Sequence, residues 1–155
     1  MNIYLVAVGN RMPDWVQAGY AEYARRLSGE CRLQLVEVPV ARRGKSAALS
    51  RLLGEEGKRM CAAIPKGALV IALDQRGQGW DTPQLTQKLK SWMQGGRDVA
   101  LLVGGPDGLA PECLARADTV WSLSPLTLPH PLVRIVVAEQ IYRSWSILRN
   151  HPYHR

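Results

Sequence analysis

Residues 99–109, with the sequence VALLVGGPDGL, decide the fold class, because a short apolar run ends there in a glycine-rich turn. An apolar run of this length bounded by a turn is typical of a buried strand. Glycine permits positive φ and close approach of the backbone to a ligand, at an entropic cost. The turn at residues 104–108 therefore has two interpretations, a sharp connection to a helix and a ligand loop. Ligands of open α/β sheets bind at the carboxyl ends of strands, which favours the second.

More short runs rich in valine, leucine and isoleucine lie on both sides of this one. They cover residues 2–8, 32–38, 68–73 and 119–123. Helical signals separate most of them and predict helices that begin at Asp14, near Ser46, at Thr82 and at Pro111, followed by a long helix over residues 132–147. This alternation predicts an α/β fold, with a mostly parallel sheet flanked by helices.

The chain of 155 residues, 46% of them hydrophobic and 21% charged, has the size and composition of one globular domain over residues 1–155. Its cysteines, Cys31, Cys61 and Cys113, lack metal-ligand spacing, so we expect reduced thiols and no metal site. No apolar run approaches the roughly 20 residues of a membrane span. Residues 1–8 also lack the features of a signal peptide, so we expect a cytoplasmic protein without a membrane partner.

The formal net charge of the chain is +7, and its isoelectric point is near 9.7. Lysine and arginine placed near phosphates release counterions and so stabilise binding to a polyanion. Nucleic acid is the first candidate partner. Charge alone does not separate such a protein from a basic protein that binds nothing in particular.

Two further segments follow expected strands. Residues 73–77, LDQRG, come after the third, and residues 123–131, LSPLTLPHP, come after the fifth. The second segment holds prolines that prevent a regular helix or central strand, together with leucines that a solvated loop rarely carries. It could form a rigid apolar wall for an adenine ring, or a buried connection. No dinucleotide fingerprint and no P-loop occur in the sequence.

Several motifs together resemble one family of enzymes. They are Leu73, VGGPDGL at residues 103–109, SLSPLTLPHPLVR at 122–134 and NHPYHR at 150–155. In this order they resemble the SPOUT methyltransferases, and most closely the family that methylates N3 of a pseudouridine in 23S rRNA. The resemblance implies a deep trefoil knot in the last third of the chain, a homodimer, and an intersubunit stem-loop of 23S rRNA in the assembled 70S ribosome as the substrate.

The resemblance also implies a site for S-adenosyl-L-methionine as the methyl donor. The matching positions are Leu73, Gly104, Leu123, Ser124, Pro125, Leu126, Thr127 and Leu128. In this family the active site lies at the interface between subunits. The apolar C-terminal helix is in keeping with a dimer, because we expect that so small a domain cannot cover Val133, Val136, Val137, Ile141 and Trp145.

Methyl transfer to N3 of pseudouridine needs alignment of the two reactants and removal of the imide proton. The adjacent residues Tyr153, His154 and Arg155 offer a base and a cation for that purpose, and we take them as the candidate catalytic group. The competing interpretation is a frayed basic terminus. His130, between two prolines, is expected to brace the cofactor loop.

The candidate RNA-binding residues are basic and flank the expected site. They are Arg42, Arg43, Lys45, Arg134, Arg143 and Arg149, with Glu139 as a possible ion-pair partner of Arg134. A solvated basic face remains the alternative for each of them singly.

Two rival functions remain open from the sequence. A non-catalytic ribosome-assembly factor with the same fold would bind ribosomes without binding the cofactor, but the intact glycine turn and the full 122–134 segment speak against it. A flavodoxin-like enzyme would fit the alternation of strands and helices, but a phosphate-cradling motif after the first strand is missing.

Overall fold

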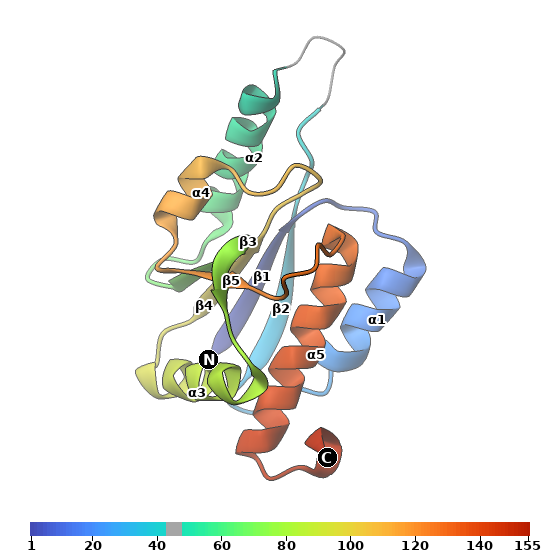
Figure 1. Cartoon of the computed structure of the whole chain (residues 1–155), viewed down its shortest axis with the longest axis vertical. Helices are drawn as coiled ribbons and strands as arrows, with labels where there is room; N and C mark the ends of the chain where they lie inside the picture. Colours follow the sequence, from blue (N-terminus) through green and yellow to red (C-terminus); the bar gives the residue numbers. More distant parts are fainter. Residues whose placement is uncertain (43–47) are drawn as a thin grey trace.

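The computed structural model describes residues 1–42 and 48–155. A five-stranded sheet forms its centre (Figure 1). The strands are β1 Asn2–Val8, β2 Arg32–Val38, β3 Leu69–Gly79, β4 Val99–Val103 and β5 Thr119–Ser122. The helices are α1 Asp14–Ala24, α2 Leu49–Ala63, α3 Thr82–Gly95, α4 Pro111–Arg116 and α5 His130–Leu148, followed by the 3₁₀ turn η1 Pro152–His154. The α/β fold with a parallel sheet is as the sequence predicts.

All strand pairs are parallel, and the spatial order is β2-β1-β4-β3-β5. Strand β4 lies at the centre and all its residues are buried. A flavodoxin-like sheet has the order 2-1-3-4-5, so the exchange of β3 and β4 removes that rival. The carboxyl ends of β3, β4 and β5 meet at one edge of the sheet.

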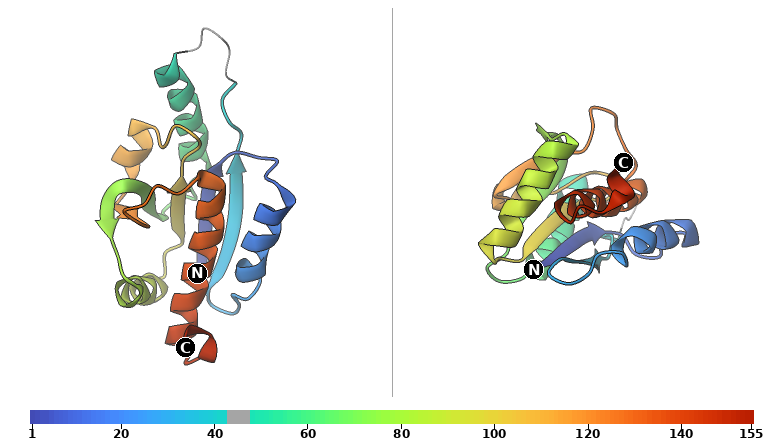
Figure 2. Two further views of the ribbon diagram at one scale, coloured as in Figure 1. Left: turned by 45° about the vertical axis from the view of Figure 1, so that its right-hand side comes forward. Right: turned by 90° about the horizontal axis from the view of Figure 1, so that it is seen from below.

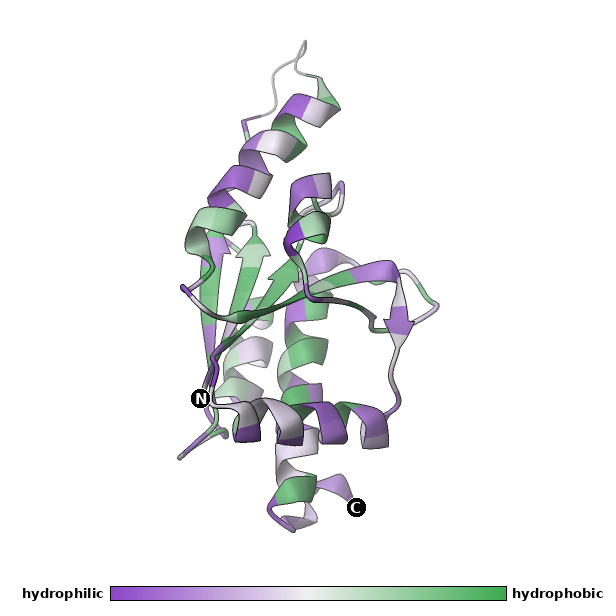
Figure 3. Cartoon of the chain, turned by 90° about the vertical axis from the view of Figure 1, so that its left-hand side faces the viewer, coloured by the Kyte–Doolittle hydropathy of each residue, from purple (hydrophilic) through white to green (hydrophobic). Residues whose placement is uncertain are grey.

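Helices cover both faces of the sheet. Helices α1 and α3 both pack against α5 on one face, and α2 packs against α4 on the other (Figure 2). Two buried clusters fill these layers, one around Leu101 and Ile141 and the other around Leu102 and Met60. Burial of each such side chain contributes about 1.5–3 kcal/mol. Figure 3 shows the central strands in the green of hydrophobic residues and the surrounding helices in mixed colours.

Local chemistry sets the helix ends. Asp81 caps α3 in a reciprocal capping box with Gln84, and Gly96 ends that helix in the left-handed conformation. Helix α1 begins at Asp14, as predicted, with Pro13 at the N-cap and no side-chain cap. Helix α5 begins at His130 rather than at residue 132, since Pro131 is tolerated in a first turn whose N–H groups have no intrahelical partner.

Strand β3 is longer than the apolar run that predicts it. Its pairing with β5 shifts register between Leu73 and Gln78, which leaves the residues between them as a bulge. A Cβ on Gly77 would lie 2.6 Å from the backbone of Val120, so only glycine fits where the bulge returns to β5. The bulge carries Asp74, Gln75 and Arg76 beyond the apolar part of the sheet.

Within residues 1–42 and 48–155, no helix combines the length and apolar character needed to cross a membrane, and no cluster of three or more potential metal ligands occurs. The trefoil knot that the family resemblance implies stays a prediction.

Candidate functional site

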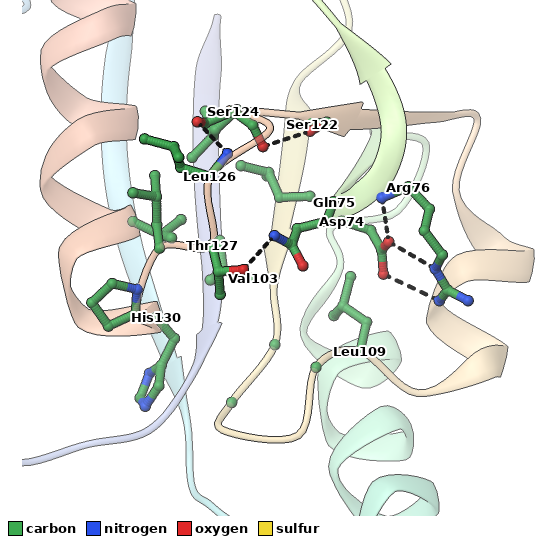
Figure 4. Close-up of a pocket in the computed structure, with 18 of the residues that line it drawn as sticks. Asp74, Gln75, Arg76, Val103, Leu109, Ser122, Ser124, Leu126, Thr127 and His130 are labelled. Atoms are coloured by element: carbon green, nitrogen blue, oxygen red, sulfur yellow. Dashed lines mark hydrogen bonds and ion pairs between the residues drawn. The ribbon is translucent and has the colours of Figure 1, made fainter.

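A cavity of about 600 Å³ opens at the carboxyl ends of β3, β4 and β5 (Figure 4). It lies between the bulge of β3, the glycine turn after β4 and the segment that joins β5 to α5. The expected cofactor residues that line it are Leu73, Gly104, Leu123, Ser124, Leu126, Thr127 and Leu128. Residues from three separate parts of the chain therefore meet in one place, as the positions at strand ends predict.

Pro125 is the expected cofactor residue that does not line the cavity; it is exposed. Its neighbours form a tight turn, in which the Ser124 hydroxyl accepts a hydrogen bond from the backbone N–H of Leu126 at 2.9 Å. The Ser122 hydroxyl donates to the carbonyl of Ser124 at 3.2 Å. The leucine side chain at the tip of this turn, Leu126, is 73% exposed and available to an apolar ligand.

The glycine turn is both a sharp connection and a wall of the cavity. A Cβ on Gly104 would lie 2.4 Å from the carbonyl carbon of Gly108, so the two backbone segments touch only because Gly104 has no side chain. Gly108 has φ +81° and donates its N–H to the carbonyl of Gly105 at 3.0 Å. The turn is therefore a sharp connection whose backbone lines the cavity at close range, and its role as a ligand loop stays a prediction.

Polar side chains from the bulge of β3 form the rim. The Gln75 amide donates to the Thr127 hydroxyl at 2.7 Å and ties the bulge to the segment after β5. The Asp74 carboxylate accepts from the Arg76 guanidinium at 3.1 Å, and this hydrogen bond is the main cause that lowers the pKa of Asp74. The sequence flagged residues 73–77 for their place after a strand but assigned no role to these three side chains.

His130, the first residue of α5, also lines the cavity. Burial is the main cause that lowers the pKa of its imidazole, and the positive charge of Arg134 adds to the effect. Its buried Nδ1 has no hydrogen-bond partner in the described structure. A neutral imidazole therefore lies beside the segment after β5. This segment is the loop that His130 is expected to brace.

Arg134 differs from its expected role. Its side chain is 2% exposed, and its guanidinium donates to the Glu37 carboxylate at 2.8 Å and to the carbonyl of Gly9 at 2.7 Å. It joins α5 to the ends of β1 and β2. The expectation that Arg134 binds RNA is corrected by this burial, and the expected pairing with Glu139 is wrong.

The candidate catalytic tail lies at the opposite end of α5 from the cavity (Figure 1). The 19 residues of α5 span about 28 Å at 1.5 Å per residue. The tail folds back along α5 as far as Glu139, which accepts a hydrogen bond from the Tyr153 hydroxyl, but Tyr153, His154 and Arg155 are not among the residues that line the cavity of their own chain. From the sequence we expect the tail and the cofactor residues to form one site. Within one subunit, the tail lies apart from those residues.

The tail is packed against α5 rather than frayed. The Tyr153 hydroxyl donates to the Glu139 carboxylate at 2.9 Å, and its ring lies 4.6 Å from that of Tyr142 between centroids. Burial and the neighbouring carboxylate raise the pKa of Tyr153 to about 12. The guanidinium groups of Arg26 and Arg143 lie over the Tyr153 ring, at 5.8 Å and 5.1 Å from its centroid.

The other candidate RNA-binding residues occupy different settings. Arg42 is exposed, whereas Arg43 and Lys45 lie outside the described residues. Arg143 is one third exposed and pairs with Glu139 at 2.8 Å. Arg149 pairs with Glu30.

The apolar residues of α5 are better covered than expected. Val137 and Ile141 are fully buried in the core of their own chain, against α1 and α3. Val133, Val136 and Trp145 keep partial exposure. The helix therefore offers a smaller free apolar face than the sequence argument for a dimer assumed.

Fold and site together define a class, a parallel α/β protein with a ligand cavity at the carboxyl ends of its strands, walled by leucines and glycine backbone. A family model described as "Predicted SPOUT methyltransferase" matches residues 1–154. The chain belongs to this SPOUT methyltransferase family.

Curated relatives match over the whole length. The chain is 61% identical over 155 residues to "Ribosomal RNA large subunit methyltransferase H" of Thioalkalivibrio sulfidiphilus (strain HL-EbGR7), covering 100% of this chain and 99% of the relative. It is 58% identical over 155 residues, with the same coverage, to the protein of that name from Hydrogenovibrio crunogenus (strain DSM 25203 / XCL-2).

Solved structures share the fold. One is a probable methylase family protein from Haemophilus influenzae Rd KW20, with a TM-score of 0.55 and 15% identity, covering 99% of this chain and 70% of that one. Another is a putative methylase family protein from Neisseria gonorrhoeae, with a TM-score of 0.54 and 18% identity, covering 91% and 81%. At these identities the likeness concerns the fold alone.

Proposed function

We propose that this chain transfers a methyl group from S-adenosyl-L-methionine to N3 of a pseudouridine in 23S rRNA, acting as a cytoplasmic homodimer on the assembled 70S ribosome. The observation that carries the proposal is the single cavity into which Leu73, Gly104 and the segment 123–128 converge. Relatives of 61% and 58% identity named as large-subunit rRNA methyltransferases support the substrate class.

The cavity suits a nucleoside with an amino-acid chain. Its volume of about 600 Å³ falls in the usual range for small-molecule sites. Leu123, Leu126 and Leu128 give apolar contact for a base, and the backbone around Gly104 approaches without a side chain between. When bound, S-adenosyl-L-methionine supplies a methyl group on a positively charged sulfur. We find the described lining residues compatible with that ligand.

The residues of this chain then have to orient the RNA base and take up its proton. N3 of pseudouridine is an imide nitrogen, so proton loss must accompany methylation and leaves negative charge spread over the neighbouring carbonyl groups. Tyr153, His154 and Arg155 provide hydroxyl, imidazole and guanidinium groups for these tasks. Because none of the three lines the cavity of its own chain, we propose that each active site uses the tail of the partner subunit.

Basic surface would hold the substrate. Each chain carries a formal net charge of +7, and a dimer doubles it. Arg42, Arg43, Lys45, Arg143 and Arg149 remain the proposed RNA contacts. Arg143 and Arg149 would have to exchange their carboxylate partners for phosphates, whereas Arg134 is a structural residue that holds α5 against the sheet.

The test is transfer of labelled methyl from S-adenosyl-L-methionine to 70S ribosomes from cells that lack this gene. Free 23S rRNA and a chain truncated before Tyr153 serve as comparisons. We expect label in 23S rRNA of intact ribosomes, little in free RNA, and little with the truncated chain. Ribosome binding without label, and without binding of the methyl donor, would instead establish the alternative of a non-catalytic assembly factor.

A further inference from the structure

The rim of the cavity carries one ion pair that the proposed chemistry leaves unused. Among the residues that line the described cavity, Asp74 is the only carboxylate and Arg76 the only guanidinium. The Asp74 side chain is 16% exposed, whereas that of Arg76 is 81% exposed and also borders a second cavity beside Gly77 and Lys88. Opposite charges therefore stand side by side at one end of the cavity.

The backbone holds this pair in place. Asp74 Oδ1 accepts from the backbone N–H of Arg76 at 2.8 Å and from its Nε at 3.1 Å, and Oδ2 lies 3.4 Å from Nη2. The bulge of β3 is fixed on one side by the close approach of Gly77 to β5. On the other side the bond from Gln75 to Thr127 joins it to the segment after β5.

Both groups keep hydrogen-bonding capacity. A carboxylate has about four acceptor positions and a guanidinium five N–H donors, so the contacts within the pair leave about one acceptor position of Asp74 and three donors of Arg76 free. The opposite wall differs in character, since Leu123, Leu126 and Leu128 present apolar side chains there. The cavity thus has an apolar end for a base and a doubly charged end for a zwitterion.

We propose that Asp74 and Arg76 together bind the amino-acid group of the cofactor, with Asp74 accepting from its α-ammonium and Arg76 donating to its α-carboxylate. This inference rests on the proposed function, because it concerns the same ligand. An α-amino acid presents an ammonium and a carboxylate on one carbon, and the adjacent carboxylate and guanidinium match that arrangement with opposite signs. The pair therefore sets the direction of the ligand, with its base toward residues 123–128.

Binding of thioether ligands tests this without any methyl transfer. The probes are S-adenosylhomocysteine, its decarboxylated analogue, its deaminated analogue, and methylthioadenosine, which lacks the whole amino-acid group. Affinities are measured by calorimetry on the full-length protein. A charge-assisted hydrogen bond contributes about 1.5–3 kcal/mol, so the wild type should bind S-adenosylhomocysteine about 10- to 100-fold more tightly than either truncated analogue.

The variants separate the two roles. Arg76→Gln should bind S-adenosylhomocysteine and its decarboxylated analogue about equally, and Asp74→Asn should no longer distinguish the deaminated analogue. Both should bind methylthioadenosine as the wild type does, which also shows that they are folded. Arg51→Gln and Glu55→Gln are the matched controls, because they break an exposed ion pair of 3.6 Å on α2 that is no part of the cavity.

Each other outcome overturns a specific claim. Equal wild-type affinity for S-adenosylhomocysteine and methylthioadenosine would refute the inference and leave the proposed function standing. No wild-type binding of any adenosyl probe would refute the proposed function itself. If Arg76→Gln lowers affinity for ribosomes but keeps the preference among the probes, Arg76 contacts RNA phosphate and the inference is wrong.

Discussion

Substitution of Gly104 by alanine tests whether the glycine turn shapes the cavity. The added Cβ would lie 2.4 Å from the carbonyl carbon and 2.5 Å from the carbonyl oxygen of Gly108, whereas ordinary contacts begin near 3.4 Å. The obstacle is backbone, so the turn must open by about 1 Å. Overpacking of this kind costs about 1–3 kcal/mol of stability.

The same displacement moves one wall of the cavity. We expect the affinity for S-adenosylhomocysteine, measured by calorimetry, to fall at least about tenfold, which corresponds to 1.4 kcal/mol. Methyl transfer should fall about 100-fold, since a misplacement of 1 Å has an effect of that order.

Gly54→Ala is the matched control for this experiment. Nothing lies within 4 Å of a Cβ at Gly54, inside helix α2, so alanine there should stabilise the protein by about 0.5–1 kcal/mol. The two variants are compared by chemical unfolding and by ligand binding. If Gly104→Ala has the same free energy of unfolding and the same ligand affinity as Gly54→Ala, the turn at Gly104 does not shape the wall of the cavity.

Three further perturbations address the interior, the pH response and the tail. Glu37→Gln leaves the buried guanidinium of Arg134 without its counter-charge and, because the Glu37 side chain is 38% exposed and partly screened by solvent, should lower the free energy of unfolding by about 1–2 kcal/mol in urea titrations; an unchanged midpoint would contradict the role of this pair. Burial and the charge of Arg134 lower the pKa of His130 in the folded chain. As the pH falls, the unfolded chain therefore takes up a proton on this imidazole before the folded chain does. The contribution of His130 to the free energy of unfolding is complete above about pH 6.5 and declines as the pH falls below that value. His130→Gln should therefore lose less stability than the wild type between pH 7.5 and 5.5, and parallel profiles would refute this assignment. Tyr153→Phe removes the bond to Glu139, so it should cost about 0.5–1.5 kcal/mol and lower kcat while cofactor affinity stays constant; a fall in that affinity instead would show that the tail contacts the cofactor site of its own chain.

The sheet could be predicted from the sequence because its strands are short apolar runs with clear ends. All the runs became strands, with bounds within a residue or two except in β3. That strand continues through Asp74, Gln75 and Arg76, whose polar side chains give no strand signal. Their place depends on the bulge opposite β5, which is a contact between distant segments.

The position of the cavity could be predicted for a similar reason. In a parallel sheet the carboxyl ends of the strands share one edge, so segments that follow different strands meet there. The buried ion pair of Arg134 could not be predicted, because its partner Glu37 lies 97 residues earlier in the chain and no local pattern indicates such a pair. The separation of the tail from the cavity follows from the length of α5 and its direction along the sheet, of which only the length is visible in the sequence.

The most direct test of the proposed composite site mixes two defective chains. Gly104→Ala impairs the cavity and keeps the tail, whereas truncation before Tyr153 removes the tail and keeps the cavity. Random pairing of equal amounts gives half mixed dimers, each with one complete site, so methyl transfer to 70S ribosomes should return to about a quarter of the wild-type rate. If the co-expressed chains form mixed dimers but transfer no more methyl than either variant alone, the tail does not act on the cavity of the partner subunit, and the account is wrong.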